Sequence, residues 1–273
     1  MGQEGALLAG EVRRRIEALA PPGLAESYDN VGWQIGWDGL PVRGILVTLD
    51  VDLRVAEEAE RVGANLIVAH HPLFFSGLKR IDPTSTRGRL LRHLLCREIG
   101  VYAAHTNLDA VRDGVNGALA AALALEAERP LRPVAGAPNG WGAGAVCHVA
   151  EPVTTTELVN RVREALESPE VRVAAAEIDG HTRIALLGGS GAEMIRDALA
   201  AGCTCYITGE VKYHQAQDAV AAGLTIVEAG HFWSERPVLA ALAEELRPLG
   251  APVHVSKVVT SPFAASEEGA GKR

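Results

Sequence analysis

The sequence predicts an α/β protein of two similar lobes, each with a mostly parallel or mixed sheet flanked by helices. Short apolar runs alternate with longer amphipathic segments along the chain, which is typical of strands followed by covering helices. A stretch dense in proline and glycine, residues 128–144, separates two such series. The length of 273 residues is sufficient for one large domain or two lobes.

The first series begins with an amphipathic helix that Pro21, Pro22 and Gly23 end. The run at 44–49 is apolar throughout, as expected for a parallel strand covered on both faces. In order, the series predicts helices at 6–19, 52–62, 86–99 and 113–126 and strands at 44–49, 64–69 and 101–104.

The second series follows the proline- and glycine-rich stretch. It predicts strands at 144–151, 170–177, 183–189, 203–208, 224–228 and 253–259 and helices at 154–166, 192–201 and 236–246. Thr155 or Thr156 is the expected cap of the first of these helices. We therefore expect lobe 1 to comprise 1–128 plus 229–273, with most of the metal ligands, and lobe 2 to comprise 129–228, with the metal site between the lobes.

The composition excludes several classes of partner. The net charge is −8 and the pI is about 5.6, and no segment is rich in Lys or Arg, so nucleic-acid binding is not predicted. No apolar stretch reaches the length of a membrane span, and the N-terminal residues lack the pattern of a signal peptide. We expect a cytoplasmic protein that does not bind membranes.

The four cysteines form no C-x-x-C pair. They are expected to be small buried residues rather than disulfide partners, and a thiolate metal site is the alternative for the pair in the second series. The four are Cys96, Cys147, Cys203 and Cys205.

Metal-binding side chains recur where the predicted strands end. His70 and His71 follow an apolar run and precede a proline, while similar positions are taken by Asp50, His105, Asp109, His231 and Glu235. Ligand sites of parallel sheets lie outside the carboxyl ends of the strands, so these side chains are expected to converge. Nitrogen and oxygen donors suit Zn, Fe(II), Mn, Co or Ni, and two such ions sharing a carboxylate would activate water for hydrolysis.

Simpler roles exist for several of these residues. Asp50 and Asp109 are also candidates for helix caps. His105 is a candidate ligand, a hydrogen-bond partner of a ligand, or a general acid or base. The sequence does not choose among these roles.

Two further segments carry candidate contacts. Glu210, Lys212 and His214 alternate, so on an extended strand they share one face, as substrate contacts or as a charged sheet edge. Glycines at 188, 189 and 191 precede a predicted helix, where they form either a packing turn or a phosphate cradle.

Five segments carry a family resemblance: SYDNVGWQIG (27–36), AHHPLFF (69–75), AHTNLD (104–109), ITGEVKYHQ (207–215) and EAGHFWSE (228–235). Together they resemble the NIF-three-like dinuclear metal-centre family, whose bacterial members are often named GTP cyclohydrolase 1 type 2 homologues. The linker between the two series is short, so the chain looks like the compact form without the inserted middle domain.

The resemblance implies two divalent metal ions. One would be held by His70 and His231, the other by His71 and Asp109, and Glu235 would bridge both. His105 would support catalysis by moving protons, and Glu210 and Lys212 lie near the pocket as weaker substrate-binding candidates. The family is similar in assembly to a toroidal homohexamer.

The function that the resemblance implies is a dinuclear-metal-dependent hydrolase that opens the imidazole ring of a purine nucleotide such as GTP, with loss of formate. A hydrolase of another nucleotide or phosphoester is the nearest alternative. The alternatives outside enzymes are a metal-binding or metal-handling scaffold and a regulatory module whose metals only stabilise the fold.

Overall fold

The computed structural model describes residues 6–138 and 141–263. The chain divides into two compact units: unit 1 comprises Met1–Leu108 and Leu239–Thr260, and unit 2 comprises Asp109–Val238 and Ser261–Arg273. These bounds differ from the lobes expected from the sequence, because residues 109–128, 229–238 and 261–273 fall in unit 2. The helices in the first two of these segments pack on the sheet of unit 2.

The sheet of unit 1 has five strands, ordered β1-β4-β3-β2-β13. Its central strands are parallel and wholly buried, as expected of apolar runs covered on both faces, whereas β1 pairs antiparallel to β4. The bounds are β1 Gly32–Ile35, β2 Ile45–Thr48, β3 Leu66–Ala69, β4 Gly100–Ala103 and β13 Val253–Val255.

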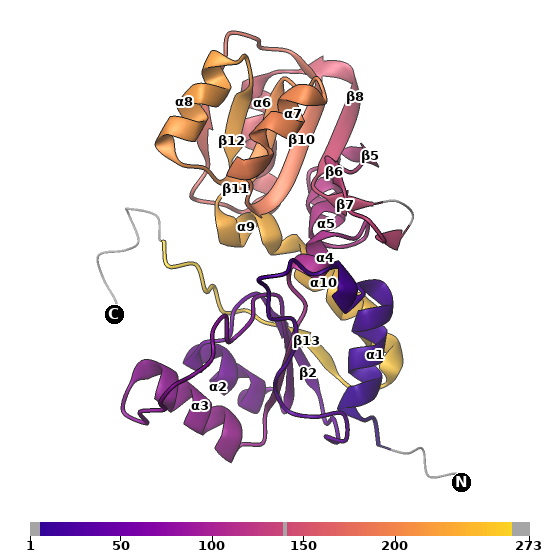
Figure 1. Ribbon diagram of the computed structural model, residues 1–273, viewed down its shortest axis with the longest axis vertical. Helices are drawn as coiled ribbons and strands as arrows, with labels where there is room; N and C mark the ends of the chain where they lie inside the picture. Colours follow the sequence, from indigo (N-terminus) through magenta and orange to yellow (C-terminus); the bar gives the residue numbers. More distant parts are fainter. Residues whose placement is uncertain (1–5, 139–140, 264–273) are drawn as a thin grey trace. The chain divides into compact units, whose positions relative to one another are not determined.

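Helices cover both faces of this sheet (Figure 1). On one face lie α2 (Leu53–Arg61) and α3 (Thr86–Cys96), whose apolar side chains share a core cluster with Val101. The other face carries α1 (Ala9–Leu19), where Glu17 accepts a hydrogen bond from the hydroxyl of Tyr102 at 3.0 Å. Beside α1 lies α10 (Pro237–Leu246), which is linked to it by the ion pair of Arg15 with Glu245. The remaining short helices are η1 Pro22–Leu24, α4 Thr106–Asp109 and η4 Arg247–Leu249.

The sheet of unit 2 has six strands, ordered β5-β8-β10-β11-β12-β9. Its three central strands β10, β11 and β12 are parallel, and β8 and β9 flank them in antiparallel orientation. The bounds are β5 Glu126–Arg129, β8 Ala145–Val153, β9 Arg172–Ala174, β10 His181–Ser190, β11 Cys205–Glu210 and β12 Thr225–Glu228. A separate pair joins β6 (Arg132–Pro133) to β7 (Gly142–Ala143).

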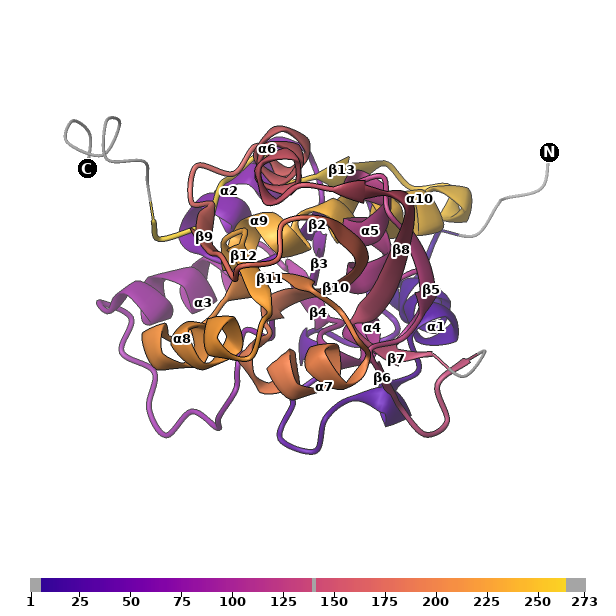
Figure 2. The same ribbon diagram turned by 90° about the horizontal axis from the view of Figure 1, so that it is seen from above.

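Helices cover both faces of this second sheet (Figures 1 and 2). On one face lie α7 (Ile195–Ala200), preceded by η3 (Ala192–Met194), and α8 (Tyr213–Ala221). The other face carries α5 (Val115–Ala122) and α6 (Thr155–Leu166). The short helix α9 (His231–Glu235) follows β12 and packs against β10 and β11. The predicted class, α/β with two mixed sheets flanked by helices, is confirmed.

Several local predictions were wrong. Thr154, rather than Thr155 or Thr156, caps α6, and its hydroxyl forms a capping box with Glu157. The 208–215 segment is not extended: β11 ends at Glu210, Lys212 takes the N-cap position of α8, and His214 lies exposed on that helix. The alternation of charges therefore does not place these three side chains on one face.

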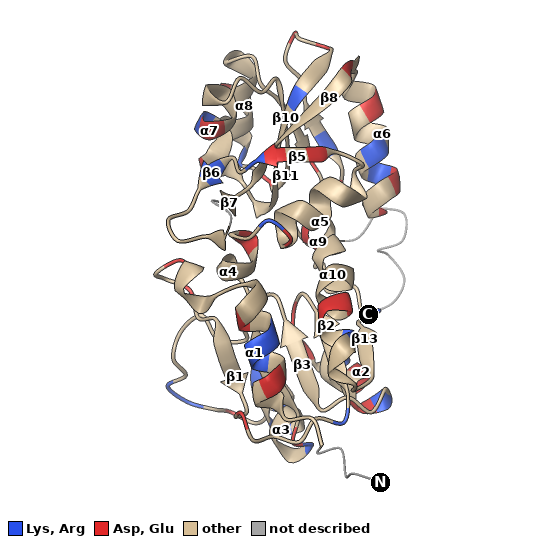
Figure 3. Cartoon of the chain, turned by 90° about the vertical axis from the view of Figure 1, so that its right-hand side faces the viewer, with Lys and Arg blue, Asp and Glu red and all other residues tan. Residues whose placement is uncertain are grey.

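Charges are mixed on the surfaces of both units. Acidic and basic residues lie together on α1 and on α6, rather than segregating into basic faces (Figure 3). Across residues 6–138 and 141–263, no helix is long and apolar enough to span a membrane.

Candidate metal centre

Three imidazoles meet at the carboxyl edge of the unit 1 sheet. His70 and His71 directly follow β3, and His105 follows its parallel neighbour β4, so the two strand ends bring the three rings together. One ligand atom from each ring lies within 4.8 Å of the others, and the ring centroids are 4.9–5.4 Å apart. This is the convergence that the sequence predicts for these residues.

Hydrogen bonds fix the tautomer of each ring. The Nδ1 atoms of His70, His71 and His105 lie 2.9, 2.8 and 2.9 Å from the Ala104 carbonyl oxygen, Asp50 Oδ1 and Asp29 Oδ1. A carbonyl or an ionised carboxylate only accepts, so each Nδ1 carries the hydrogen and donates it. The lone pair of a neutral ring is then on Nε2, as in histidines that bind metals.

Asp29 is the support that sequence analysis missed. Its side chain is 0% exposed and also accepts hydrogen bonds from the Thr106 backbone NH at 3.1 Å and the Thr106 hydroxyl at 2.5 Å. Burial alone would raise the pKa of Asp29, but the bonds from Thr106 and His105 hold it below its ordinary value. The carboxylate is therefore ionised at neutral pH. Asp29 lies in segment 27–36, one of the five segments that carry the family resemblance, and this position could have identified it from the sequence.

Asp50 is likewise a support rather than a helix cap. Its second oxygen accepts a hydrogen bond from the Thr260 hydroxyl at 2.5 Å, while Asp52 is the residue that caps α2. The cap role considered for Asp50 is therefore wrong.

His105 is electrically neutral near pH 7. Burial is the largest cause that lowers the pKa of His105 below its ordinary value, and the neighbouring His70 lowers it further, although Asp29 acts in the opposite direction. A neutral ring with its hydrogen on Nδ1 leaves Nε2 able to bind an ion or to accept a proton.

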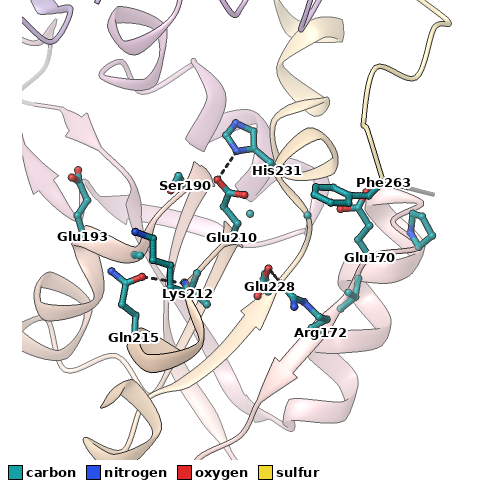
Figure 4. Close-up of a pocket in the computed structure, with 16 residues that line it drawn as sticks. Glu170, Arg172, Ser190, Glu193, Glu210, Lys212, Gln215, Glu228, His231 and Phe263 are labelled. Atoms are coloured by element: carbon teal, nitrogen blue, oxygen red, sulfur yellow. Dashed lines mark hydrogen bonds and ion pairs between the residues drawn. The ribbon is translucent and has the colours of Figure 1, made fainter. Parts of the chain in front are cut away.

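Unit 2 holds a second group of donors on α9. Gly230 precedes this helix with φ 84°, a conformation that favours glycine, and a Cβ there would lie 2.8 Å from the Trp233 ring. The four-residue spacing places His231 Nε2 3.3 Å from Glu235 Oε1, while its Nδ1 lies 3.3 Å from Glu210 Oε1 (Figure 4). A neutral ring that donates its Nδ1 hydrogen to Glu210 turns the lone pair of Nε2 toward Glu235, so a nitrogen donor and an oxygen donor lie side by side. The donor set therefore fits a metal ion.

Glycines near the end of β10 allow α5 and α9 to approach the strand. A Cβ on Gly189, whose φ is +71°, would lie 2.2 Å from Glu235 Oε1, and one on Gly188 would lie 2.6 Å from Val115. The NH of Gly189 donates to the Ser234 hydroxyl at 3.0 Å. These glycines thus allow close packing, which is the first of the two roles predicted for this segment, a packing turn or a phosphate cradle.

Asp109 ends α4 and belongs to unit 2. It does not cap α5, whose N-cap is Gly114, so that alternative is wrong. The side chain of the buried Asn116 donates to the Asp109 carbonyl at 3.0 Å and accepts from the Gly188 NH at 3.1 Å. Asn116, which sequence analysis also missed, thereby links the backbone of Asp109 to the strand that borders Glu235.

A cavity of about 780 Å³ in unit 2 opens beside His231 (Figure 4). Both weaker substrate candidates line it, but they differ in their surroundings. Glu210 is bonded to His231, whereas Lys212 is exposed. Glu210 therefore supports a histidine in addition to lining the cavity.

The cysteines do not contribute a thiolate. Cys147, Cys203 and Cys205 are buried, and burial raises the pKa of Cys203 to about 11. Buried thiols with raised pKa values are poor sources of thiolate at neutral pH. The thiolate alternative is therefore not supported, and the expectation of small buried residues is confirmed for these three, whereas Cys96 is exposed.

Known proteins resemble the chain over nearly its whole length. The sequence pattern of the family described as Duf34/NIF3 (NGG1p interacting factor 3) matches residues 8–262. A relative from Streptomyces coelicolor, called "GTP cyclohydrolase 1 type 2 homolog", is 34% identical over 93% of each chain. One of the same name from Nostoc sp. is 38% identical over 86% of this chain and 89% of its own.

Solved structures agree with this assignment. A Bacillus cereus protein related to NIF3 superposes with a TM-score of 0.89 at 26% identity, covering 95% of this chain and 99% of its own. The alignment with a Bacillus subtilis relative, 25% identical, spans 363 positions, so it includes residues with no counterpart among the 273 here. On the family match and the identities of its relatives, the chain belongs to the Duf34/NIF3 family.

Proposed function

We propose that this protein is a hydrolase that depends on two divalent metal ions. The observation that carries the proposal is the set of three clustered imidazoles, His70, His71 and His105, each with Nδ1 bound to an oxygen acceptor. With its hydrogen held on Nδ1, each neutral ring has its lone pair on Nε2, where it can bind a metal ion or accept a proton.

The ligands are assigned by family resemblance. His70 and His231 would hold one ion, His71 and Asp109 the other, and Glu235 would bridge the two. Zn, Fe(II), Mn, Co and Ni all suit nitrogen and oxygen donors. When bound, such a pair of ions would lower the pKa of a water molecule and so supply hydroxide for hydrolysis.

The chain itself supplies proton transfer. His105, neutral and held by Asp29, accepts a proton at Nε2 from the attacking water and returns it to the leaving nitrogen or oxygen atom. Asp29 keeps the ring in the required tautomer throughout, because its ionised carboxylate accepts the Nδ1 hydrogen.

A purine nucleotide is the proposed substrate, because relatives carry the name GTP cyclohydrolase 1 type 2 homolog. The reaction would be hydrolytic opening of the imidazole ring with loss of formate. The cavity beside His231, lined by Glu210 and Lys212, provides space for a small molecule.

Metal content and turnover test the proposal together. We expect two ions per purified chain, and loss of at least one ion with an at least ~100-fold fall in turnover in His71→Ala and Glu235→Ala. The matched control is His148→Ala, an exposed histidine on β8. Full metal content and unchanged turnover in both His71→Ala and Glu235→Ala would refute the proposed function. Two ions without hydrolysis of any nucleotide or phosphoester would favour the metal-handling scaffold instead.

A further inference from the structure

The cavity of unit 2 lies outside the carboxyl ends of three parallel strands. Its lining includes Ser190, Glu210 and Glu228, the last residues of β10, β11 and β12. This is the usual place for a ligand in a parallel α/β sheet. The volume, about 780 Å³, lies within the range of small-molecule sites.

Carboxylates outnumber cations in the lining. The acidic residues are Glu170, Glu193, Glu210 and Glu228, and the basic residues are Arg172 and Lys212. Arg172 is ion-paired with Glu228 (Figure 4), which leaves Lys212 as the one lining cation with no carboxylate partner among the described residues. A triphosphate carries several negative charges and is normally bound by several cations or backbone NH groups, so this lining disfavours it.

The same carboxylates favour a ligand that donates hydrogen bonds. Ionised carboxylates only accept, and NH or amino groups on a ring are their natural partners. Glu170 is held in place by hydrogen bonds of 2.8 Å from the Trp233 ring NH and from the Ser261 hydroxyl. Glu193 lies 3.9 Å from Arg132 in a long ion pair, and its side chain is 73% exposed, so the carboxylate can also reach a ligand.

An aromatic ring stands at the rim of the cavity. Phe263 lines the cavity and is 65% exposed, although exposed phenyl groups are costly in water (Figure 4). The hydroxyl of Ser261, two residues earlier, ties this segment to Glu170. Stacking of a planar heterocycle on the ring would bury its exposed face.

We propose that this cavity binds a planar nitrogen heterocycle that has NH or amino donors and no more than one phosphate, such as a nucleobase, nucleoside or nucleoside monophosphate. Nucleoside diphosphates and triphosphates should bind more weakly, because the lining side chains include more carboxylates than cations. The proposal rests on the proposed function, because it places the reacting ring beside His231. It narrows the substrate from nucleotides in general to those with no more than one phosphate.

Calorimetric titration of the purified protein, with its metal content determined, tests the proposal using guanosine, GMP and GTP as probes. The three share one base and differ only in their phosphates. We expect guanosine and GMP to bind at least tenfold more tightly than GTP. Tighter binding of GTP than of guanosine would overturn the proposal, and so would failure of all three to bind.

Two variants locate the binding in the cavity. Phe263→Ala should lower the affinity for guanosine and GMP several-fold, because the stacking ring is lost. Lys212→Met should lower the affinity for GMP about tenfold and leave that for guanosine unchanged. The matched controls are Ile178→Ala and Lys257→Met, which lie outside the lining. Unchanged affinities in both test variants would overturn the proposal. The binding measurement does not depend on catalysis. A protein that binds guanosine through Phe263 but hydrolyses nothing would therefore refute the proposed function and leave the binding proposal standing.

Discussion

Each of the four histidines in the two donor groups directs Nδ1 toward an oxygen. The partner is a backbone carbonyl for His70 and a carboxylate for His71, His105 and His231. Such partners orient the ring and raise the basicity of the other nitrogen. The supporting carboxylates therefore matter to the site as much as the rings they hold.

Asp29→Asn tests this support at one residue. The amide fills the same space, but an NH2 group replaces one of the two accepting oxygens, so either His105 or Thr106 loses its acceptor and we expect stability to fall by about 1–3 kcal/mol. Nitrogen NMR of the imidazoles should show that His105 no longer has its hydrogen fixed on Nδ1. Asp38→Asn, at an exposed ion pair with Arg13, should cost much less stability than Asp29→Asn. Equal losses in the two variants would contradict the role given to Asp29.

His181 gives stability a pH dependence that is separate from the donor groups. The buried ring lies between the hydroxyls of Thr155 at 3.0 Å and Thr204 at 2.9 Å, and burial lowers its pKa below the ordinary value. The unfolded chain therefore binds a proton near pH 6.5 that the folded chain does not. Stability from this group is complete above that pH and is lost as the pH falls below it.

Urea unfolding at pH 7.5 and 5.5 measures this effect. The wild type should lose more stability between the two values than His181→Gln, whatever the cost of that substitution at either pH. His148→Gln, at an exposed position on β8, should keep the wild-type dependence. A His181→Gln variant with the wild-type dependence would rule His181 out as the source.

At the scale of elements, α9 is positioned by the glycines of β10. Gly189→Ala would place a Cβ against Glu235 and strain a positive φ, so we expect a loss of more than ~2 kcal/mol and fewer bound metal ions. Gly63→Ala separates the two causes, because Gly63 has φ +75° and nothing within 4 Å of the added atom. That control should cost only about 1 kcal/mol by urea unfolding. Similar costs would show that contact with Glu235 is unimportant.

Elements also differ in how well the sequence predicts them. The buried strands β2, β3 and β4 are continuous apolar runs and were predicted within a residue or two. The helix α8 was not predicted at all, since its N-cap is Lys212, a residue that rarely caps helices, and its capping box is completed by Gln215. The short edge strand β1 was missed because its four residues are all only partly buried.

For the whole molecule, we predict a homohexamer. The expectation comes from family resemblance, and light scattering should give six times the 28.8 kDa chain mass. Ions that bind only the folded chain stabilise it, so chelation should lower the melting temperature. A monomer in solution would contradict the hexamer. An unchanged melting temperature after verified metal removal would exclude the metal-stapled alternative.

The sequence by itself determined the α/β class, most strands and helices, and the convergence of His70, His71 and His105. These follow from periodicity and from the rule that neighbouring parallel strands end at one edge, both of which are visible in a linear chain. The four-residue spacing of His231 and Glu235 was equally visible.

Only the tertiary structure decided which residues support the rings and where the units divide. Asp29 and His105 are 76 residues apart, and Asp50 and Thr260 are 210 apart, so no periodic pattern links either pair. A helix belongs to the unit whose sheet it covers with its apolar face. The sequence of α5 predicts an apolar helix but not the sheet on which that helix packs. Contacts between distant segments arise only when the chain folds, and for that reason they are absent from any local reading of it.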